Sequence, residues 1–254
     1  MKKVQDFKVK SYNWLNDSSY VITLQSKSDI APILPGNFAE VEVPHASDIF
    51  LRRPLSFLDV DYEQKTISFY IKVIGKGTKR LGSYNEGDDI SIIYPLGNSF
   101  TVNGSSNVLI VGGGSGIAPF ILLARELQKK NIKTTFLFGA RTAKEIVLNE
   151  EFGKYGNILV TTEDGSLGEK GLVTQHSVFS SDQTFDKIFT CGPDPMMKAI
   201  AKIAQEKNIP CDVSLENMMA CGFGACLCCV TETTTGNKCV CTEGPVFDVN
   251  ELAW

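Results

Sequence analysis

The first hundred residues contain short apolar segments in which hydrophobic and polar side chains partly alternate. Such segments, rich in β-branched and aromatic residues, are typical of strands with one buried face. Turn signals at 35–36, 75–77 and 86–88 separate them. Strands are expected at 21–25, 38–43, 55–60, 67–73 and 90–93. Several short strands without a convincing helical stretch predict a small antiparallel barrel.

The pattern changes near residue 105, where the apolar run 108–111 has the continuity of a strand buried on both faces. Strand and helix patterns then alternate, which predicts a doubly wound parallel sheet in an α/β domain. Strands are expected at 108–111, 134–140, 157–162, 187–191 and 212–216, and helices at 119–130, 144–152, 171–179 and 195–207.

The tail from residue 217 is rich in Cys and Gly, shows little periodicity, and is too small to fold on apolar burial alone. The chain is therefore expected to form three domains: a β-barrel over 1–103, an α/β domain over 104–216, and a small Cys-rich domain over 217–254.

Composition narrows the function classes. With 254 residues, a net charge of −4 and 43% hydrophobic residues, the chain is close to the globular average, which excludes a disordered or fibrous protein. Scattered Lys and Arg with mild acidity argue against a nucleic-acid partner. No apolar run approaches the roughly 18–20 residues of a transmembrane segment. The basic N-terminus lacks the apolar core of a signal peptide, so a cytoplasmic location is expected.

Two strand-to-helix turns are candidates for nucleotide binding. The run GGGSGIAP at 112–119 follows a buried strand, and glycines there let a phosphate approach backbone N–H groups. Its spacing departs from G-x-G-x-x-G, so a plain tight connection remains an equal alternative. The run CGPDP at 191–195 ends a second strand, which places both turns at the ligand-binding edge of the sheet. The candidates are Gly112, Gly113, Gly114, Gly116, Pro119, Cys191, Gly192 and Pro193.

The predicted barrel carries a second set of candidates. Arg52 and Arg53 open the run RRPLS, and a guanidinium fork suits phosphate, although a solvated strand end is the plainer interpretation. The run GKGT at 75–78 offers backbone N–H groups to a second phosphate. Tyr70 is either an ordinary buried aromatic residue or a side chain that packs on a ring.

Six of the eight cysteines lie in the last 34 residues. Cys221, Cys226 and Cys229 follow C-x4-C-x2-C, the spacing of plant-type 2Fe–2S sites, among small residues that leave room for a cluster. Spacing alone leaves the fourth ligand open between Cys239 and Cys241. A zinc site formed by Cys226, Cys229, Cys239 and Cys241 is the alternative, and it leaves Cys221 unexplained. Disulfides or free thiols are a third alternative.

Taken together, these runs resemble one family over essentially the whole chain. RPLS, GxGT, GGGSGIAP, CGPDPMM and the C-terminal cysteine loop occur in the order found in the ferredoxin–NADP⁺ reductase superfamily with an added cluster domain. A narrower resemblance is carried by the runs LRRPLSF, TEDGSLGEKGLVT, LENMMACGFGACLCCV and CTEGPVF. Within this superfamily, the chain is similar to the electron-transfer subunits of class B dihydroorotate dehydrogenases.

The resemblance implies three cofactors: FAD in the barrel, NAD in the α/β domain, and a 2Fe–2S cluster in the tail. The implied FAD residues are Arg53, Pro54, Leu55, Ser56, Tyr70, Ile71, Lys72, Gly77 and Thr78. The implied cluster ligands are Cys221, Cys226, Cys229 and Cys241. Many reductases of the superfamily carry an aromatic residue where Leu55 stands. No acid–base catalytic residue is required for hydride transfer, and His45 and His176 are interpreted as ordinary.

The implied function is electron transfer in pyrimidine biosynthesis, from an FMN-containing dihydroorotate dehydrogenase subunit through the cluster and FAD to NAD⁺, in a heterotetramer. One alternative is the small subunit of an NAD(P)H–ferredoxin or NAD(P)H–sulfur oxidoreductase. Another is a non-catalytic, zinc-stabilised binding module. Nucleotide domains usually carry an acidic residue about 20 positions after the glycine turn. This chain lacks it and has Arg141 after the second parallel strand, so NAD rather than NADP rests on the resemblance.

Overall fold

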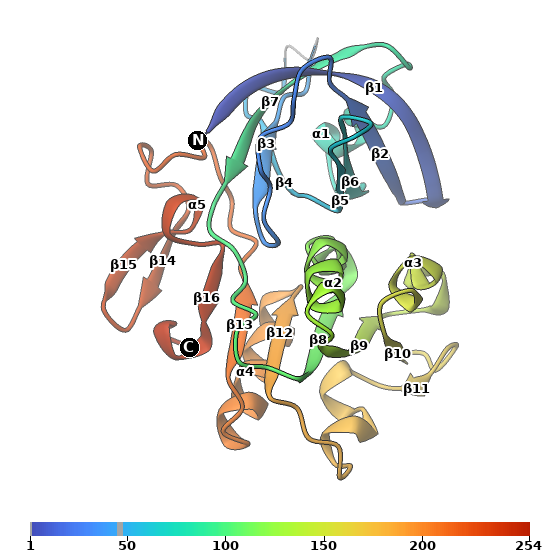
Figure 1. Ribbon diagram of the computed structural model, residues 1–254, viewed down its shortest axis with the longest axis vertical. Coiled ribbons are helices and arrows are strands. Elements are labelled where there is room, and N and C mark those ends of the chain that lie inside the picture. Colours follow the sequence, from blue (N-terminus) through green and yellow to red (C-terminus); the bar gives the residue numbers. More distant parts are fainter. Residues whose placement is uncertain (1, 45–47) are drawn as a thin grey trace.

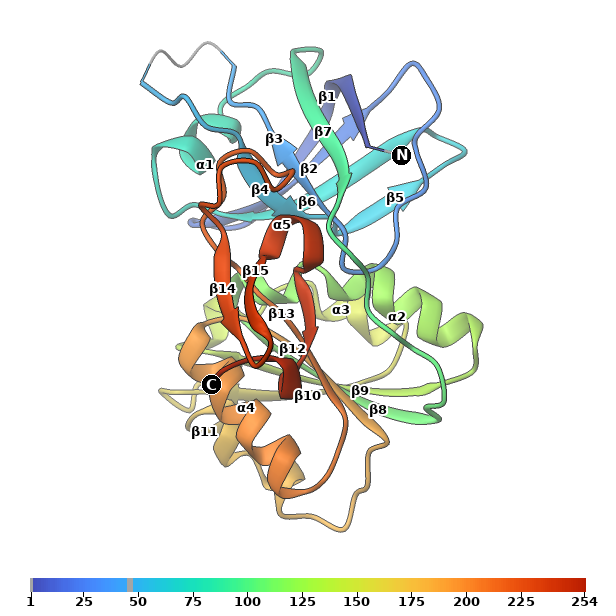
Figure 2. The same cartoon turned by 90° about the vertical axis from the view of Figure 1, so that its left-hand side faces the viewer.

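The computed structural model describes residues 2–44 and 48–254, so His45 lies outside the described residues. Two sheets lie one above the other in Figure 1, with helix α2 (Phe120–Lys129) between them. The C-terminal segment runs along one side of both sheets, as Figure 2 shows from a second direction. Among the described residues, no helix is long and apolar enough to cross a membrane.

The upper sheet has seven antiparallel strands in the order β4-β3-β7-β1-β2-β6-β5 and curves as a half-barrel, which confirms the predicted barrel class. Its strands are β1 (Lys3–Asn16), β2 (Ser19–Gln25), β3 (Phe38–Val41), β4 (Arg53–Ser56), β5 (Asp59–Asp61), β6 (Thr66–Lys72) and β7 (Asp89–Leu96). The sequence did not predict β1, because only Phe7 and Val9 of this long strand are buried and polar residues dominate the rest.

Two other predictions for this sheet were wrong in detail. The expected strand 55–60 is divided, because Phe57 N–H donates to Asn37 and Leu58 N–H donates to Ser68, so the backbone changes partner strand at this point. The run GKGT is also not a loop. It begins the short helix α1 (Lys76–Leu81), whose backbone carbonyl at Thr78 accepts a 2.7 Å hydrogen bond from Tyr20.

The lower sheet has the order β11-β10-β9-β8-β12-β13-β16. Strands β8 to β13 pair in parallel, as the alternation of strand and helix patterns predicts. They are β8 (Asn107–Gly113), β9 (Lys133–Ala140), β10 (Asn157–Thr162), β11 (Glu169–Lys170), β12 (Lys187–Cys191) and β13 (Cys211–Ser214).

The helices of this domain confirm two predictions and contradict two. Helices α2 and α4 (Asp194–Glu206) match the expected ranges closely. The expected helix 144–152 is only η2 (Ala143–Glu145) followed by α3 (Asn149–Gly153). The expected helix 171–179 is two 3-10 turns, η3 (Val173–Gln175) and η4 (Ser177–Phe179). Between them His176 is extended and buried, and its Nδ1 accepts from Val178 N–H at 3.0 Å.

The C-terminal segment packs on both sheets. Strands β14 (Val230–Thr233) and β15 (Gly236–Cys239) form a hairpin, and α5 (Val240–Glu243) follows it. Strand β16 (Val246–Asp248) then pairs antiparallel with β13 at the edge of the lower sheet, and η5 (Val249–Glu251) follows. Cys229, Cys241 and Phe38 belong to one apolar core, so this segment shares its packing with the half-barrel.

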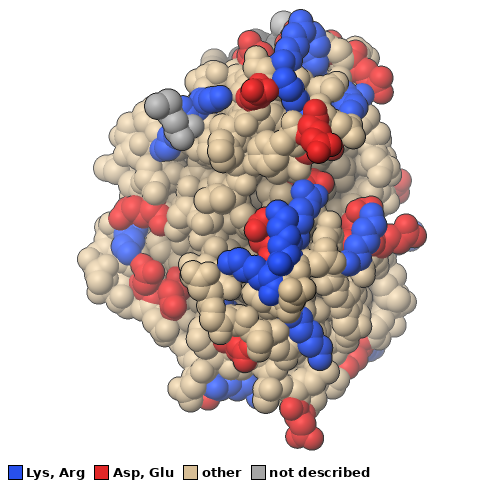
Figure 3. Space-filling model, viewed as in Figure 1, with Lys and Arg blue, Asp and Glu red and all other residues tan. Residues whose placement is uncertain are grey.

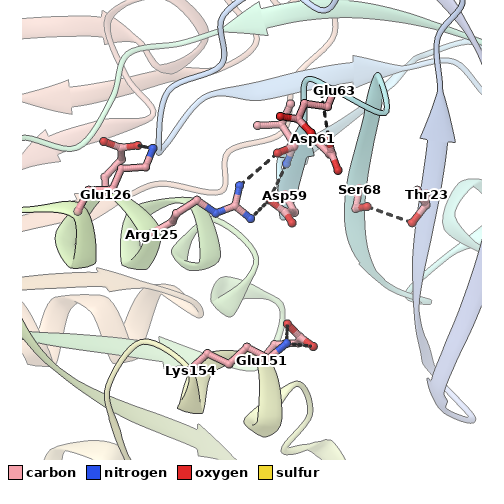
Figure 4. Close-up of polar contacts among 11 residues, drawn as sticks. Thr23, Asp59, Asp61, Glu63, Ser68, Arg125, Glu126, Glu151 and Lys154 are labelled. Carbon is pink, nitrogen blue, oxygen red and sulfur yellow. Dashed lines mark hydrogen bonds and ion pairs between the residues drawn. The ribbon is translucent and has the colours of Figure 1, made fainter.

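The half-barrel and the α/β domain of the lower sheet are joined by ion pairs as well as by packing. In Figure 4 Arg125 of α2 points at Asp59 of β5, and it also donates to the Val60 carbonyl at 3.2 Å. On another side, Lys72 of β6 pairs with Glu145 of η2 at 2.8 Å. These contacts fix the relative placement of the two clefts described below.

Candidate functional site

The two turns predicted to bind nucleotide meet in space. Strands β8 and β12 are neighbours, with Cys191 in register with Gly112. A Cβ on Gly116 would overlap the carbonyl of Cys191, and a Cβ on Gly192 would lie 3.0 Å from Gly113 N. Only glycine permits this approach, so the glycines bring the two turns together at the carboxyl edge of the sheet.

A cleft of about 400 Å³ opens beside these turns. Gly113, Gly114 and Pro193 line it, together with Lys72 from the half-barrel. The other five candidates belong to the same two turns, where they are buried: Gly112, Gly116, Pro119, Cys191 and Gly192. The exposed side chains of Glu163 and Arg141 also line this cleft. We refer to it as the nucleotide cleft.

A second cleft, of about 570 Å³, lies between the half-barrel and the C-terminal segment. Its size is within the range of small-molecule and cofactor sites. Eight of the nine candidates for flavin binding line it: Arg53, Pro54, Leu55, Ser56, Tyr70, Ile71, Lys72 and Thr78. The ninth, Gly77, lies directly under the Arg53 guanidinium, which a Cβ at this position would overlap. We refer to this as the flavin cleft.

The structure separates the roles of the two adjacent arginines. Arg52 donates to the Ser91 carbonyl at 2.6 Å and to the Ser91 hydroxyl at 3.1 Å, and it pairs with Glu42. Arg53 donates to nearby backbone carbonyls and, among the described residues, pairs with no carboxylate. Arg52 therefore holds strands together, and Arg53 has the charge available for an anionic ligand.

Lys72 lines both clefts and connects them. Its ammonium lies 2.8 Å from Oε2 of Glu145, and Arg141 Nε lies 3.0 Å from Oε1 of the same carboxylate. The hydrogen bond from Lys72, with further attraction from Arg141, holds the pKa of Glu145 below its usual range. One carboxylate thus holds two cations, one from each domain.

The clustered cysteines form two thiol pairs. Cys221 lies near Cys226, and Cys241 lies near Cys229, with the Cys241 N–H 3.4 Å from the Cys229 sulfur. Burial raises the pKa of Cys221, but hydrogen bonds from Phe223, Cys226 and Ala225 outweigh it and lower the pKa to about 6. Burial and the neighbouring Cys229 raise the pKa of Cys241 to about 12.

The two remaining thiols of the segment lie outside these pairs. Burial, followed by the nearby Cys229, raises the pKa of Cys239, and Cys221 and Cys226 also lie near this thiol. Cys228 is exposed and lines the flavin cleft. Within the described part of the chain, no three Cys, His, Asp or Glu side chains surround a single point that could hold one metal ion.

Comparison with known proteins matches these sites to two family models. The model for the iron–sulfur cluster binding domain of dihydroorotate dehydrogenase B matches residues 216–253. The model for the oxidoreductase NAD-binding domain matches residues 110–202.

Whole-chain relatives extend this match. The electron transfer subunit of dihydroorotate dehydrogenase B (NAD(+)) from Clostridium acetobutylicum is 41% identical over 242 residues, covering 94% of this chain and 92% of its own. The counterpart from Bacillus caldolyticus is 36% identical over 250 residues, 96% of each chain. The chain belongs to the family of dihydroorotate dehydrogenase B electron transfer subunits.

Solved structures agree with this placement. A structure of an NADH-dependent reduced ferredoxin–NADP oxidoreductase, studied for flavin-based electron bifurcation, has a TM-score of 0.88 and 31% identity, covering 98% of this chain and 90% of its own. The ferredoxin reductase of carbazole 1,9a-dioxygenase shares the fold, with a TM-score of 0.71 and 20% identity over 82% of this chain and 67% of its own.

As a member of the dihydroorotate dehydrogenase B electron transfer family, the chain is an oxidoreductase component that uses a 2Fe–2S cluster, FAD and NAD. The residues present fit these groups. Two thiol pairs suit a cluster in which each iron takes two cysteine ligands. Positive φ angles of 72° and 86° at Gly222 and Gly224 shape the loop around them. The unpaired Arg53 and the buried Tyr70 suit the phosphate and the ring of a flavin nucleotide.

Two acids near the clefts, the exposed Glu216 and the buried Glu40, were not predicted from the sequence. Glu216 lines the flavin cleft, and its Oε1 accepts from the Cys191 thiol at 3.8 Å. Although the residue is exposed as a whole, desolvation of its carboxyl group raises its pKa above the usual range. Glu40 is fully buried on β3, and neither of its carboxylate oxygens has a partner among the described residues. Burial raises the pKa of Glu40 to about 7 against the pull of Arg52. Glu40 alternates with Glu42 in the run FAEVEV, as a solvent-facing strand residue would, so only the fold reveals its burial.

Proposed function

We propose that this chain is the electron-transfer subunit of an NAD-linked dihydroorotate dehydrogenase in pyrimidine biosynthesis. Electrons would pass from a catalytic partner through the 2Fe–2S cluster and FAD to NAD⁺. The family's name implies a partner subunit. We propose that this partner contains FMN, that the assembly is a heterotetramer, and that it is cytoplasmic.

The contiguity of the three sites carries this proposal. Asn217, Met218 and Met219, which precede the cysteine loop (221–229), and Cys228 within it all line the flavin cleft. At the other end of the flavin cleft, Lys72 also lines the nucleotide cleft. Groups bound at the three sites would therefore lie in the order cluster, flavin, nicotinamide. When bound, FAD exchanges a hydride with the nicotinamide and single electrons with the cluster.

The site residues take separate roles in this proposal. Arg53 would bind a flavin phosphate, and Ser56 would hydrogen-bond the ring that packs beside Tyr70 and Leu55. Gly113, Gly114 and Pro193 would contact the nucleotide, and the remaining glycines would hold the two turns together. Cys221, Cys226, Cys229 and Cys241 would be the cluster ligands. The burial of Cys241 and its N–H at 3.4 Å from the Cys229 sulfur support Cys241 over the half-buried Cys239. We propose domain boundaries at 103/104 and 216/217.

The cysteine loop also supplies a surface for the partner. Phe223 and Leu227 are 55% and 64% exposed, beside the proposed ligands. The face drawn in Figure 3, by contrast, is charged: Lys and Arg side chains gather near its middle, with acidic side chains beside them. Because electrons enter at the cluster, we propose that the catalytic subunit docks over Phe223 and Leu227.

Anaerobic co-purification tests the proposal directly. The chain is expressed with a candidate catalytic subunit, and the complex is analysed for iron, acid-labile sulfide, FAD and FMN. We expect two irons, two sulfides and one FAD per chain, and dihydroorotate-dependent NAD⁺ reduction by the complex only. Protein that contains zinc and no labile sulfide would refute the cluster and favour a binding module.

A second candidate function is electron exchange between NAD(P)H and ferredoxin. The 31% identity and the TM-score of 0.88 to the ferredoxin–NADP oxidoreductase chain favour it. The purified chain is therefore assayed with ferredoxin and with dihydroorotate plus the partner. Turnover with ferredoxin alone would favour this second function over the first.

A further inference from the structure

Arg141 lies where dinucleotide-binding sheets distinguish the two nicotinamide cofactors. It follows β9, the parallel neighbour of β8 with its glycine turn, and lines the nucleotide cleft. At this position an acidic side chain takes the ribose 2′-hydroxyl of NAD, whereas an arginine accommodates the 2′-phosphate of NADP. By residue type alone, Arg141 would favour the phosphorylated cofactor.

The structure shows that Arg141 already has an anionic partner. Its Nε lies 3.0 Å from Oε1 of Glu145, and the other oxygen of this carboxylate lies 2.8 Å from Lys72. The side chain of Glu145 is only 19% exposed, whereas that of Arg141 is 71% exposed. Lys72 therefore holds the carboxylate in place from the half-barrel, and the carboxylate in turn holds the more mobile guanidinium.

The charges of the cleft oppose a 2′-phosphate as well. Its charged lining residues are Lys72, Arg141, Glu145 and Glu163, two cations and two anions. The N–H of Glu163 donates to the Ala140 carbonyl at 3.1 Å, so this second acid sits beside the end of β9. A 2′-phosphate would bring a charge of roughly −1.5 to −2 next to these two carboxylates, while both cations of the cleft already pair with Glu145. The ribose 2′-hydroxyl of NAD could instead donate a hydrogen bond to the carboxylate of Glu145 or of Glu163.

We propose that Glu145 is a specificity-determining residue, which selects NAD over NADP by binding Arg141 and by repelling a 2′-phosphate. This inference rests on the proposed function, because it concerns the nucleotide cleft of the same electron path. The choice between NAD and NADP would then depend on ion pairs that join the two domains, in which Lys72 holds Glu145 and Glu145 holds Arg141. It would not depend on an acidic residue at the end of β9.

Steady-state reduction of an artificial dye by the full-length, FAD-loaded chain tests this assignment with NADH and with NADPH. We expect Glu145→Gln to raise the ratio of kcat/KM for NADPH to that for NADH about tenfold, through a lower KM for NADPH. Adding Arg141→Ala to this variant is expected to remove most of the gain. Glu151→Gln is the matched control, because Glu151 pairs with Lys154 on the surface near α3 and lines neither cleft.

Equilibrium binding gives a second readout that needs no flavin chemistry. Calorimetry with 5′-AMP and 2′,5′-ADP should show the same change in preference for Glu145→Gln. An unchanged preference, or a gain that survives Arg141→Ala, would overturn the assignment to the Glu145–Arg141 pair. If the wild-type chain with FAD reduces dye with neither nucleotide, the proposed function fails and this inference fails with it.

Discussion

Glu40 lies directly beneath Gly222, so that a Cβ on Gly222 would fall 2.8 Å from Glu40 Cγ. Gly222 follows the first proposed cluster ligand and has a φ of 72°. The buried carboxyl of the half-barrel and the cysteine loop are therefore in close contact. This contact links the strand that lines the flavin cleft to the loop that would carry the cluster.

Gly222→Ala should disrupt the cysteine loop without harming the flavin cleft. Alanine is strained at positive φ by about 1–2 kcal/mol, and its methyl group would also displace Glu40. We expect iron and labile sulfide in anaerobically purified protein to fall by more than half, with FAD content retained. Gly236→Ala is the control, because it has a φ of 111° but open space around it. Adding Glu40→Ala should restore part of the lost cluster. Full cluster content in Gly222→Ala would show that the contact is unimportant.

Arg52 and Arg53 should respond differently to truncation. Arg53→Ala removes the guanidinium that has no carboxylate partner among the described residues, so we expect lower FAD occupancy after dialysis and little change in apoprotein stability. Arg52→Ala removes the charged hydrogen bonds to the Ser91 carbonyl, which keeps the Glu42 N–H as a donor, and to the Ser91 hydroxyl, and it should lower the free energy of unfolding by about 1–3 kcal/mol. Flavin absorbance and urea unfolding measure the two effects. Undiminished flavin in Arg53→Ala would contradict its role in phosphate binding.

Removal of one proposed ligand should separate the two halves of the electron path. Cys226→Ser is expected to keep NADH-dependent dye reduction, because the flavin and nucleotide clefts are intact, and to abolish electron transfer with the partner subunit. Cys228→Ser is the matched control, since Cys228 lies outside both thiol pairs. Unimpaired transfer by Cys226→Ser would refute the proposed path through the cluster.

The choice between Cys239 and Cys241 can be tested in the same way. The Cys241 N–H lies 3.4 Å from the Cys229 sulfur, whereas Cys239 lies near Cys229, Cys221 and Cys226 without a hydrogen bond to these thiols among the described residues. We expect Cys241→Ser to lose the cluster and Cys239→Ser to retain it, as read from visible absorbance and labile sulfide under anaerobic conditions. The opposite result would make Cys239 the fourth ligand.

The Lys72–Glu145 pair should make a pH-dependent contribution to stability. The pKa of Glu145 is lower in the folded chain than its ordinary value of 4.5. The contribution is therefore fully present above pH 4.5 and is lost as the pH falls through the folded-state pKa. Near neutral pH, Glu145→Gln should lower the free energy of unfolding by about 0.5–1 kcal/mol, because the pair is partly screened by solvent. This difference should vanish in acid, whereas exposed Glu151→Gln should cost little at any pH. A difference that persists unchanged at low pH would exclude the ion pair as its cause.

The local sequence pattern was sufficient to predict an element where the spacing of its hydrophobic residues matches the side chains that the fold buries. Helix α2 buries Phe120, Leu123, Ala124 and Leu127 on one face, and its range follows from that spacing. Strand β1 was not predicted because it has few buried side chains of its own. Its backbone pairing with β2 and β7 holds it in the sheet instead. The helix expected at 171–179 failed because extended His176 separates two short turns.

By itself, the sequence determined the half-barrel, the parallel sheet, the glycine turns and the cysteine spacing, because each depends on residues close together in the chain. Tertiary structure decided the rest. It showed that Arg52 holds two strands together whereas Arg53 does not. It also placed Cys241 near Cys229, and Glu145 between Lys72 and Arg141. These relationships join residues from different strands and domains. Their energies depend on distance and burial, which no local pattern of residue types encodes.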